Sequence, residues 1–268
     1  MIESGKYQEA QEVQAEYRKR LVQEWQIAEG ARILEVGCGQ GDMTALLAQA
    51  VGSFGVVLAV DIASPNYGSP LTLGEATTIL KRSEIGPQID FRFEFDVLEP
   101  LNSFANNSFD CVVMAHCSWY FATADQLLLT LKKVRPWTKI LCFAEWDIVP
   151  KSTEQVPHLL AVIIQGQVEA FKTNSSANIR TPLTKSRLKQ LLQESGWSVI
   201  RESNMDTRNL QDADWEVDMC LRESLEEVRR LNLPDKFVSS VESQVEILRE
   251  RAKPKGNPSL NSYSLVAN

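Results

Sequence analysis

One segment constrains this chain more than any other: an apolar run that ends in a glycine-rich turn and continues into a helical pattern, ILEVGCGQGDMT at 33–44. The continuous apolar run is typical of a strand buried on both faces. Glycines at 37, 39 and 41 permit a tight turn and leave no Cβ between the backbone and a ligand. The segment therefore predicts an α/β sheet with a ligand-binding loop at the end of its first strand.

Further apolar runs bounded by turn residues alternate with helical patterns along the next hundred residues. The expected strands are 32–37, 55–60, 88–95, 109–115 and 139–145, and the expected helices are 43–51, 73–81 and 124–134, after a leading amphipathic helix at 6–28. Strand–helix alternation implies right-handed crossovers and a parallel sheet. We expect a Rossmann-like, doubly wound sheet.

The pattern changes after Pro150. A long apolar helix at 156–171 has a broad hydrophobic face, which we interpret as a lid over a substrate. Further helices are expected at 184–194, 212–230 and 235–252, with a strand at 197–203. The 268 residues suit one domain, divided into an N-terminal helix (1–30), a cofactor-binding core (31–150), a lid with sheet completion (151–255) and a terminal strand (256–268).

Composition excludes several functional classes. A formal net charge of -7 disfavours nucleic acid as a partner, because affinity for phosphates comes largely from Lys and Arg. No apolar run approaches the roughly 18 to 20 residues that a membrane span needs, and we expect a cytoplasmic protein. With five unclustered cysteines and two histidines, His116 and His158, the sequence offers no metal site.

Acidic residues around the glycine turn predict the charge of the ligand. Asp61 ends the second strand, where a dinucleotide-type fold places the acid that accepts from ribose hydroxyls. Asp42 stands where a pyrophosphate loop would have glycine, and Glu35 precedes the turn. Two such carboxylates would repel a pyrophosphate, whereas they would stabilise a sulfonium or ammonium. This pattern favours S-adenosylmethionine over NAD.

These residues resemble the first motif of the class I S-adenosylmethionine-dependent methyltransferases, an acid followed by three alternate glycines. VLAVDIAS and FEFDVLEPL resemble the segments that hold ribose through Asp61 and the adenine amino group through Asp96, and FDCVVMAHCSWYF resembles the fourth-strand motif. The resemblance implies about seven strands, with SYSLVA as an antiparallel last strand. The cofactor set it implies is Glu35, Gly37, Cys38, Gly39, Gly41, Asp61, Ile62, Asp96, Val97 and His116.

A narrower resemblance extends to a bacterial group of uncharacterised methyltransferases, some of which carry a cyclopropane-fatty-acid-synthase-like label. It is carried by DIASPNYGSPLTLGEA, AHCSWYF, AEW, the HLLAVIIQG helix and NIRT. The label leaves lipid chemistry open.

The reacting end of the site is expected beyond the fourth and fifth strands. His116 follows an apolar strand at the edge where open α/β sheets bind ligands, so it is either a general base or part of the pocket wall. Trp119, Tyr120 and Glu145 are expected to line the substrate pocket, and Tyr17 to help cover it.

The acceptor is predicted to be a small molecule. HCSWYF replaces the Asn-Pro-Pro-aromatic signature of enzymes that methylate exocyclic amines and amides. The expected function is S-adenosylmethionine-dependent methyl transfer. The alternatives are a protein that binds the cofactor without methylating and one that transfers a methylene group to lipid.

Overall fold

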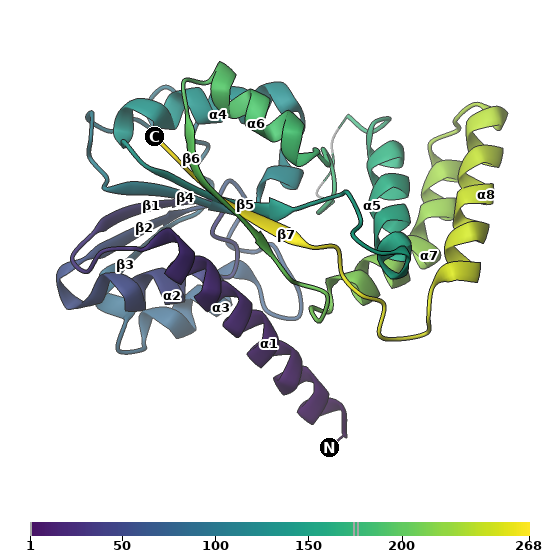
Figure 1. The fold of residues 1–268 in the computed structure, drawn as a ribbon, viewed down its shortest axis with the longest axis horizontal. Coiled ribbons are helices and arrows are strands. Elements are labelled where there is room, and N and C mark those ends of the chain that lie inside the picture. Colours follow the sequence, from purple (N-terminus) through teal and green to yellow (C-terminus); the bar gives the residue numbers. More distant parts are fainter. Residues whose placement is uncertain (1, 174, 176) are drawn as a thin grey trace.

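The computed structural model describes residues 2–173, 175 and 177–268, with side chains from residue 11 onward. A seven-stranded sheet forms its centre (Figure 1). The strands are β1 (Arg32–Val36), β2 (Val56–Val60), β3 (Ile89–Arg92), β4 (Cys111–Ala115), β5 (Leu141–Trp146), β6 (Val199–Met205) and β7 (Ser262–Ala267).

The strand order, β3-β2-β1-β4-β5-β7-β6, confirms the predicted fold class. Strands β1 to β5 are parallel, and β7 is antiparallel to both β5 and β6. From β1 the chain adds β2 and β3 on one side and then returns to add β4 and β5 on the other. The boundary between β1 and β4 is therefore the topological switch point where such folds bind ligands.

Helices cover both faces of the sheet and form a third body beside it (Figure 1). They are α1 (Ile2–Trp25), α2 (Asp42–Val51), α3 (Leu73–Lys81), α4 (Ala124–Val134), α5 (Val156–Glu169), α6 (Lys185–Glu194), α7 (Asp212–Arg230) and α8 (Asp235–Arg251). One core cluster includes buried side chains of α1 and α2, and the other those of α4 and α6.

The parallel register brings the candidate site residues to one edge. Val36 pairs with Val60, and Ala115 pairs with Ala144. The chain segments that leave β1, β2, β4 and β5 therefore all start at the carboxyl edge of the sheet. Strand β5 is buried at every position, which accounts for its unbroken apolar pattern.

Two predicted elements have other bounds than expected, one because it is shorter and one because it is shifted toward the N-terminus. The strand predicted at 88–95 ends at Arg92, because Glu94 has a φ of 54° and Phe95 N donates to Asp61 O. The helix predicted at 6–28 starts at Ile2 and ends at Trp25, where Gln26 turns with a φ of 54°.

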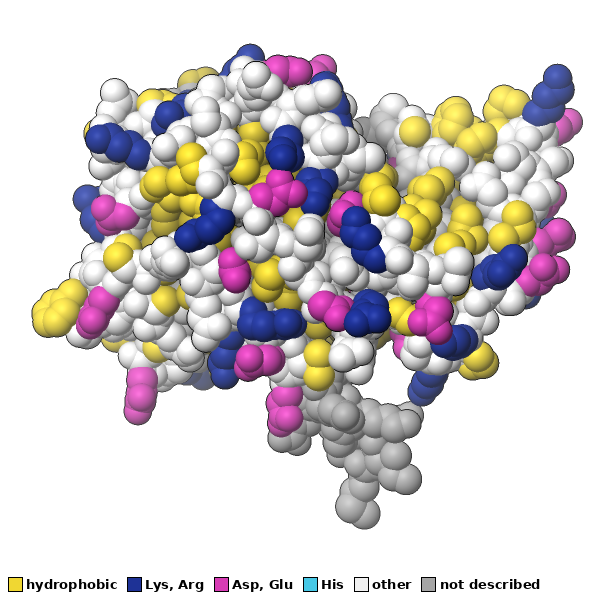
Figure 2. Space-filling model, in the orientation of Figure 1, with side chains coloured by type: hydrophobic (Ala, Val, Ile, Leu, Met, Phe, Trp, Pro, Cys, Tyr) yellow, Lys and Arg dark blue, Asp and Glu magenta, His cyan; other side chains and the backbone are white. Residues whose placement is uncertain are grey.

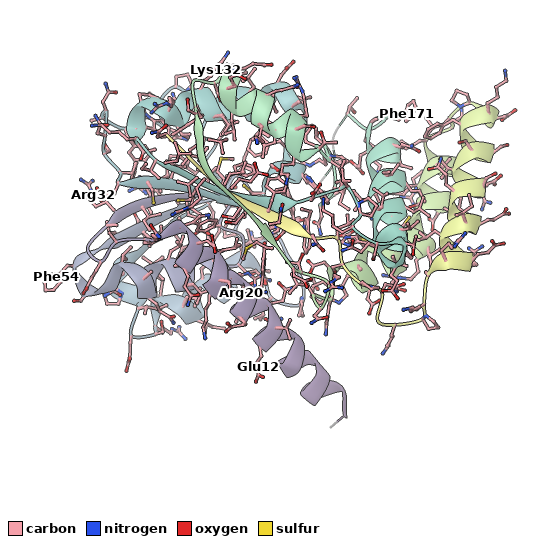
Figure 3. All side chains as sticks on the ribbon, in the orientation of Figure 1. Glu12, Arg20, Arg32, Phe54, Lys132 and Phe171 are labelled. Atoms are coloured by element: carbon pink, nitrogen blue, oxygen red, sulfur yellow. The ribbon has the colours of Figure 1, made fainter. Side chains whose placement is uncertain are left out.

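Helix α5 packs against α7 and α8 in a separate hydrophobic cluster, and Phe171, just beyond α5, contacts Phe237 of α8 edge to face (Figure 3). The broad apolar face of α5 is therefore already covered by α7 and α8, and it is no evidence that α5 closes over a substrate. Closure of this body remains a prediction. Figure 2 shows hydrophobic side chains gathered over α5 and α8, and charges of both signs spread across the same face. Among the described residues, no helix combines the length and apolar character that a bilayer crossing needs.

Candidate active site

The glycine turn joins β1 to α2 and touches the end of β4. A Cβ added at Gly37, whose φ is 79°, would lie 2.6 Å from the Cβ of Cys117, so no other residue fits there without a shift. At Gly39 the φ is 53° and a Cβ would meet nothing within 4 Å. The turn is therefore closed against the β4 edge at one glycine and open at the other, where a ligand can approach the backbone.

Asp61 supports the open part of the turn. Its Oδ2 accepts a hydrogen bond from Gly39 N at 2.9 Å, and its Oδ1 accepts one from Ala63 N at 2.9 Å. Each carboxylate oxygen can accept a second bond, so Asp61 retains capacity for two ribose hydroxyls. Ile62, next in the chain, is 57 % exposed.

Asp96 stabilises a turn with one carboxylate oxygen and leaves the other oxygen available. Its Oδ1 accepts from Leu98 N at 2.8 Å, while within the described chain Oδ2 has no hydrogen bond. Val97 is buried in the core, which fixes the turn beside the sheet. The free oxygen can accept from an adenine amino group.

The acids at 35 and 42 do not act as the free charges that the sequence suggested. Glu35 is buried and accepts a hydrogen bond from Thr44 Oγ1 at 2.6 Å, and removal from solvent raises its pKa to about 8. Asp42 forms an ion pair with Arg18 at 3.2 Å. At neutral pH Glu35 therefore tends to hold its proton, and the charge of Asp42 is paired with that of Arg18. Neither residue is the unpaired charge that was expected, so these two acids do not by themselves favour S-adenosylmethionine over NAD.

His116 lies at the carboxyl end of β4 with a φ of 51°. Its Nε2 is 2.6 Å from Tyr17 Oη, and Nδ1 lies 3.3 Å from Glu145 Oε1 without forming a hydrogen bond. Tyr17 also bonds Ser262 Oγ at 2.7 Å. The imidazole side chain is 23 % exposed, whereas Tyr17 is 2 % exposed. Tyr17 therefore holds His116 from the buried side of the contact, and its expected part in covering the pocket remains a prediction.

Glu145 positions the short helical turn Ser118–Tyr120 that follows His116. Its Oε2 accepts from Ser118 N at 3.0 Å and from Ser118 Oγ at 2.7 Å, and its Oε1 accepts from Trp146 N at 3.0 Å. The Glu145 carboxylate is buried, and its hydrogen bonds fix the backbone of this turn. Of the predicted pocket residues, Trp119 is 4 % exposed and Tyr120 is 42 % exposed, so Tyr120 presents the more accessible surface.

The sequence reasoning missed two carboxyl groups on α7. Asp212 accepts from Gln14 Nε2 at 2.7 Å, and Glu216 accepts from Gln165 Nε2 at 2.8 Å. Desolvation raises the pKa of both, that of Glu216 to about 7, and the hydrogen bond from Gln14 opposes the rise at Asp212. Their spacing of one helical turn was the available signal, but it is also typical of a solvated helix face.

The remaining histidine and the cysteines belong to the core. His158 Nδ1 accepts from Leu260 N at 2.8 Å, and burial lowers its pKa to about 3. All five cysteines are free and buried, and burial raises the pKa of Cys38 and Cys117, which makes a thiolate nucleophile unfavourable. In the part of the chain that the structure describes, no three His, Cys, Asp or Glu side chains are grouped to hold a metal ion.

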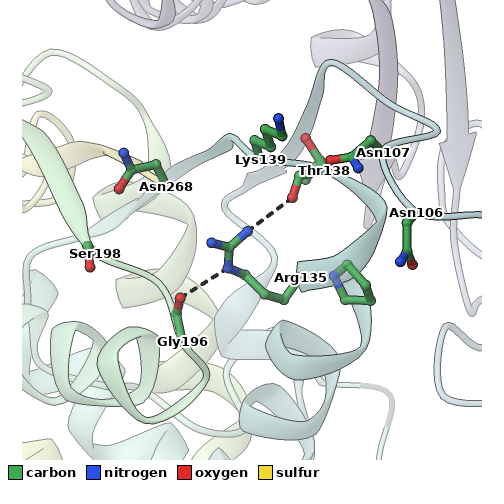
Figure 4. Close-up of a pocket in the computed structure, with 9 residues that line it drawn as sticks. Asn106, Asn107, Arg135, Thr138, Lys139, Gly196, Ser198 and Asn268 are labelled. Carbon is green, nitrogen blue, oxygen red and sulfur yellow. Dashed lines mark hydrogen bonds between the residues drawn. The ribbon is translucent and has the colours of Figure 1, made fainter.

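A polar hollow lies at the opposite edge of the sheet (Figure 4). Within it, Arg135 Nε donates to Gly196 O at 3.0 Å and Nη1 donates to Thr138 O at 3.2 Å. Thr138 precedes β5, so the hollow adjoins the amino end of that strand. Ligands of open α/β sheets bind at the carboxyl ends, and we assign this hollow no catalytic role.

Comparison with known proteins agrees with the fold and the glycine turn. A methyltransferase-domain family model matches residues 33–139. The chain belongs to the S-adenosylmethionine-dependent methyltransferase family. Over nearly its whole length it is similar to a cyclopropane-fatty-acyl-phospholipid synthase-like protein from Lactobacillus casei ATCC 334, with 34 % identity, a TM-score of 0.85, and coverage of 97 % of this chain and 92 % of that one.

Two more distant similarities limit what can be said of this chain's activity. Methyltransferase phomM' of Diaporthe leptostromiformis is 26 % identical over a 208-residue match that covers 63 % of this chain and 54 % of that protein. The chain thus spans about half the length of that curated relative. The [4+2]-cyclase SpnF shares the fold alone, at 13 % identity and a TM-score of 0.56, over 94 % of this chain and 79 % of that one.

Proposed function

We propose that this protein transfers the methyl group of S-adenosylmethionine to a small-molecule acceptor. The observation that carries the proposal is the close packing of Gly37 on Cys117, the residue that follows His116. This contact supports the proposal, because the loop that we expect to hold the cofactor then lies next to the residue that follows the candidate base.

The residues present fit this cofactor. The turn is open at Gly39, Asp61 has unused acceptor capacity, and within the described chain Asp96 Oδ2 has no hydrogen bond. When bound, S-adenosylmethionine supplies a methyl group already activated by its sulfonium. The tasks left to the protein are alignment, exclusion of water and, for a protonated acceptor atom, removal of a proton.

His116 is our candidate for that proton removal, at Nε2. This nitrogen faces Tyr17, so it must first exchange the tyrosine hydroxyl for the acceptor. Tyr17 keeps a hydrogen bond to Ser262 when it does so, which limits the cost of the exchange. Glu145, 3.3 Å from Nδ1, would stabilise the imidazolium that results.

Two measurements test the proposal. Calorimetry should show S-adenosylmethionine binding more tightly than NAD, and incubation with the water-soluble fraction of a cell extract should produce S-adenosylhomocysteine. Tighter binding of NAD would overturn the cofactor assignment. Binding without any S-adenosylhomocysteine would overturn methyl transfer and leave a cofactor-binding protein with other chemistry.

A second candidate function is methylene transfer to a lipid chain. It is favoured by the name of the Lactobacillus casei relative and by exposed hydrophobic side chains on and beside the α5–α7–α8 body, Phe171, Trp215 and Ile247. In the same assay, product formed from the lipid fraction and not from the water-soluble fraction would favour this candidate.

A further inference from the structure

The segment NIRT, 178–181, is fixed on the helical turn that follows His116. Trp119 O accepts from Arg180 N at 2.9 Å and from Thr181 N at 3.0 Å. Thr181 Oγ1 donates to Phe121 O at 2.8 Å, and Ile179 is buried in the core cluster that also contains Trp119. The backbone of Arg180 is thereby anchored to Trp119, which follows the candidate base His116 by three residues.

Two donors at this junction have no acceptor. The indole N–H of Trp119 and the Nε–H of Arg180 are both enclosed by the protein, and neither makes a hydrogen bond within the described residues. Within the described residues, the Arg180 guanidinium also forms no ion pair, although the protein has a net negative charge. Trp119 is 4 % exposed. An enclosed donor without an acceptor is costly, and more so when it is charged.

Both orphaned groups are donors only, so both call for an acceptor from outside the chain. A guanidinium matches a carboxylate or a phosphate through paired N–H bonds. Asp212 lies within electrostatic range of His116, and Glu216 within that of Tyr120, so either carboxyl group adds negative potential near this junction when it is ionised. A singly charged group is repelled less by these carboxyls than a doubly charged phosphate.

We infer that Arg180 and Trp119 form a subsite for the carboxylate of the methyl acceptor, so that the acceptor is a small carboxylic acid. This rests on the proposed function, because it names the substrate class of that same site. The carboxylate would be held beside the helical turn at Trp119, and the atom to be methylated would lie toward His116. Arg180 and Trp119 act here as binding residues with no part in proton transfer.

The test measures binding, so it does not depend on turnover. The full chain saturated with S-adenosylhomocysteine is titrated calorimetrically with acetate, glycolate and benzoate, with the amide of each, and with inorganic phosphate. We expect at least one carboxylate to bind about tenfold or more tightly than its amide. Equal binding of every acid and amide, or tighter binding of phosphate, overturns the inference.

Variants locate the site. Arg180→Gln should weaken carboxylate binding about tenfold to a hundredfold and leave amide binding unchanged. Trp119→Phe should weaken it less, about threefold to tenfold, because a neutral hydrogen bond is lost. Arg187→Gln, on the exposed surface of α6, is the matched control and should change nothing.

Two further measurements separate the possible failures. Without ligand, the Tm of Arg180→Gln should equal or exceed that of the wild type, since an orphaned charge is removed. A fall of several degrees would make Arg180 a structural residue and overturn the inference. S-adenosylmethionine affinity should be unchanged in this variant. If the wild type itself fails to bind S-adenosylmethionine, it is the proposed function that fails.

Discussion

The cofactor side and the acceptor side of this site are built differently. On the cofactor side, Asp61 and Asp96 each accept from a backbone N–H two residues further on, and Asp61 also accepts from one on the neighbouring glycine turn. On the acceptor side, His116 is held by side chains from α1 and β5, and Tyr17 in turn by β7. Local backbone geometry therefore determines the first half of the site, and long-range side-chain contacts determine the second. Mutations should reveal this difference.

The largest effect is expected from His116→Ala. If Nε2 accepts the proton of the acceptor, turnover should fall about a hundredfold to ten-thousandfold while S-adenosylmethionine affinity stays nearly intact. The acid limb of the pH–rate profile should disappear. Steady-state kinetics across pH 5 to 9 would measure both.

His158→Gln is the matched control for this variant, because His158 is a core histidine. It should lower stability and leave the acid limb in place. A small loss in the His116 variant, confined to substrate binding and with the limb unaltered, would remove His116 from proton transfer and make it part of the pocket wall.

Asp61→Ala probes the cofactor side and should have the next largest effect. Losing charge-assisted hydrogen bonds to ribose predicts a dissociation constant about tenfold to a hundredfold higher for S-adenosylmethionine. Calorimetry on a folded variant measures this. Asp90→Ala, which removes an exposed partner of Arg92 on β3, should leave the affinity unchanged. Unchanged affinity in the Asp61 variant would contradict the ribose assignment.

Glu35 links the cofactor side to stability. Burial raises its pKa to about 8, so between pH 4.5 and 8 the folded chain holds a proton that the unfolded chain releases. The free energy of unfolding should therefore fall as pH rises through this window, by at most about 1.4 kcal/mol per pH unit from this group. Denaturant unfolding without cofactor measures the slope.

Glu35→Gln should flatten this dependence, because the amide can accept the Thr44 bond without titrating. Glu84→Gln, at an exposed position, should leave the slope as in the wild type. Identical slopes in the wild type and the Glu35 variant would show that the carboxyl is ionised in the folded protein.

The smallest effect is expected from Tyr17→Phe. The variant should lose about 1 kcal/mol of stability with its hydrogen bonds, and turnover should change only a few-fold. An acceptor nitrogen left without its donor takes up a proton more readily, so the acid limb should move to higher pH. Ser262→Ala removes the other partner of Tyr17 and should cost similar stability without moving the limb. Equal profiles in both variants would separate Tyr17 from the chemistry.

Several sequence predictions were confirmed for a shared reason. The parallel sheet and the turn at 37–41 depend on neighbouring residues, through apolar runs, turn glycines and backbone sterics, whereas the antiparallel last strand was implied by the family resemblance. The expectation of unpaired charges at Glu35 and Asp42 was not met, because ionisation depends on burial and on Arg18, which is distant in the sequence. The roles of the individual site residues remain predictions.

By itself, the amino-acid sequence determined the fold class, the place of the ligand turn and the membership in a methyltransferase family. The first two follow from periodicity and glycine geometry, which are local properties that the sequence displays directly, and the third from the resemblance of several motifs. Only the tertiary structure decided that Tyr17 forms a hydrogen bond with His116, that α5 already has its partners, and that Arg180 meets Trp119. Those contacts join residues dozens of positions apart, and no local pattern specifies which distant side chain will satisfy a buried polar group.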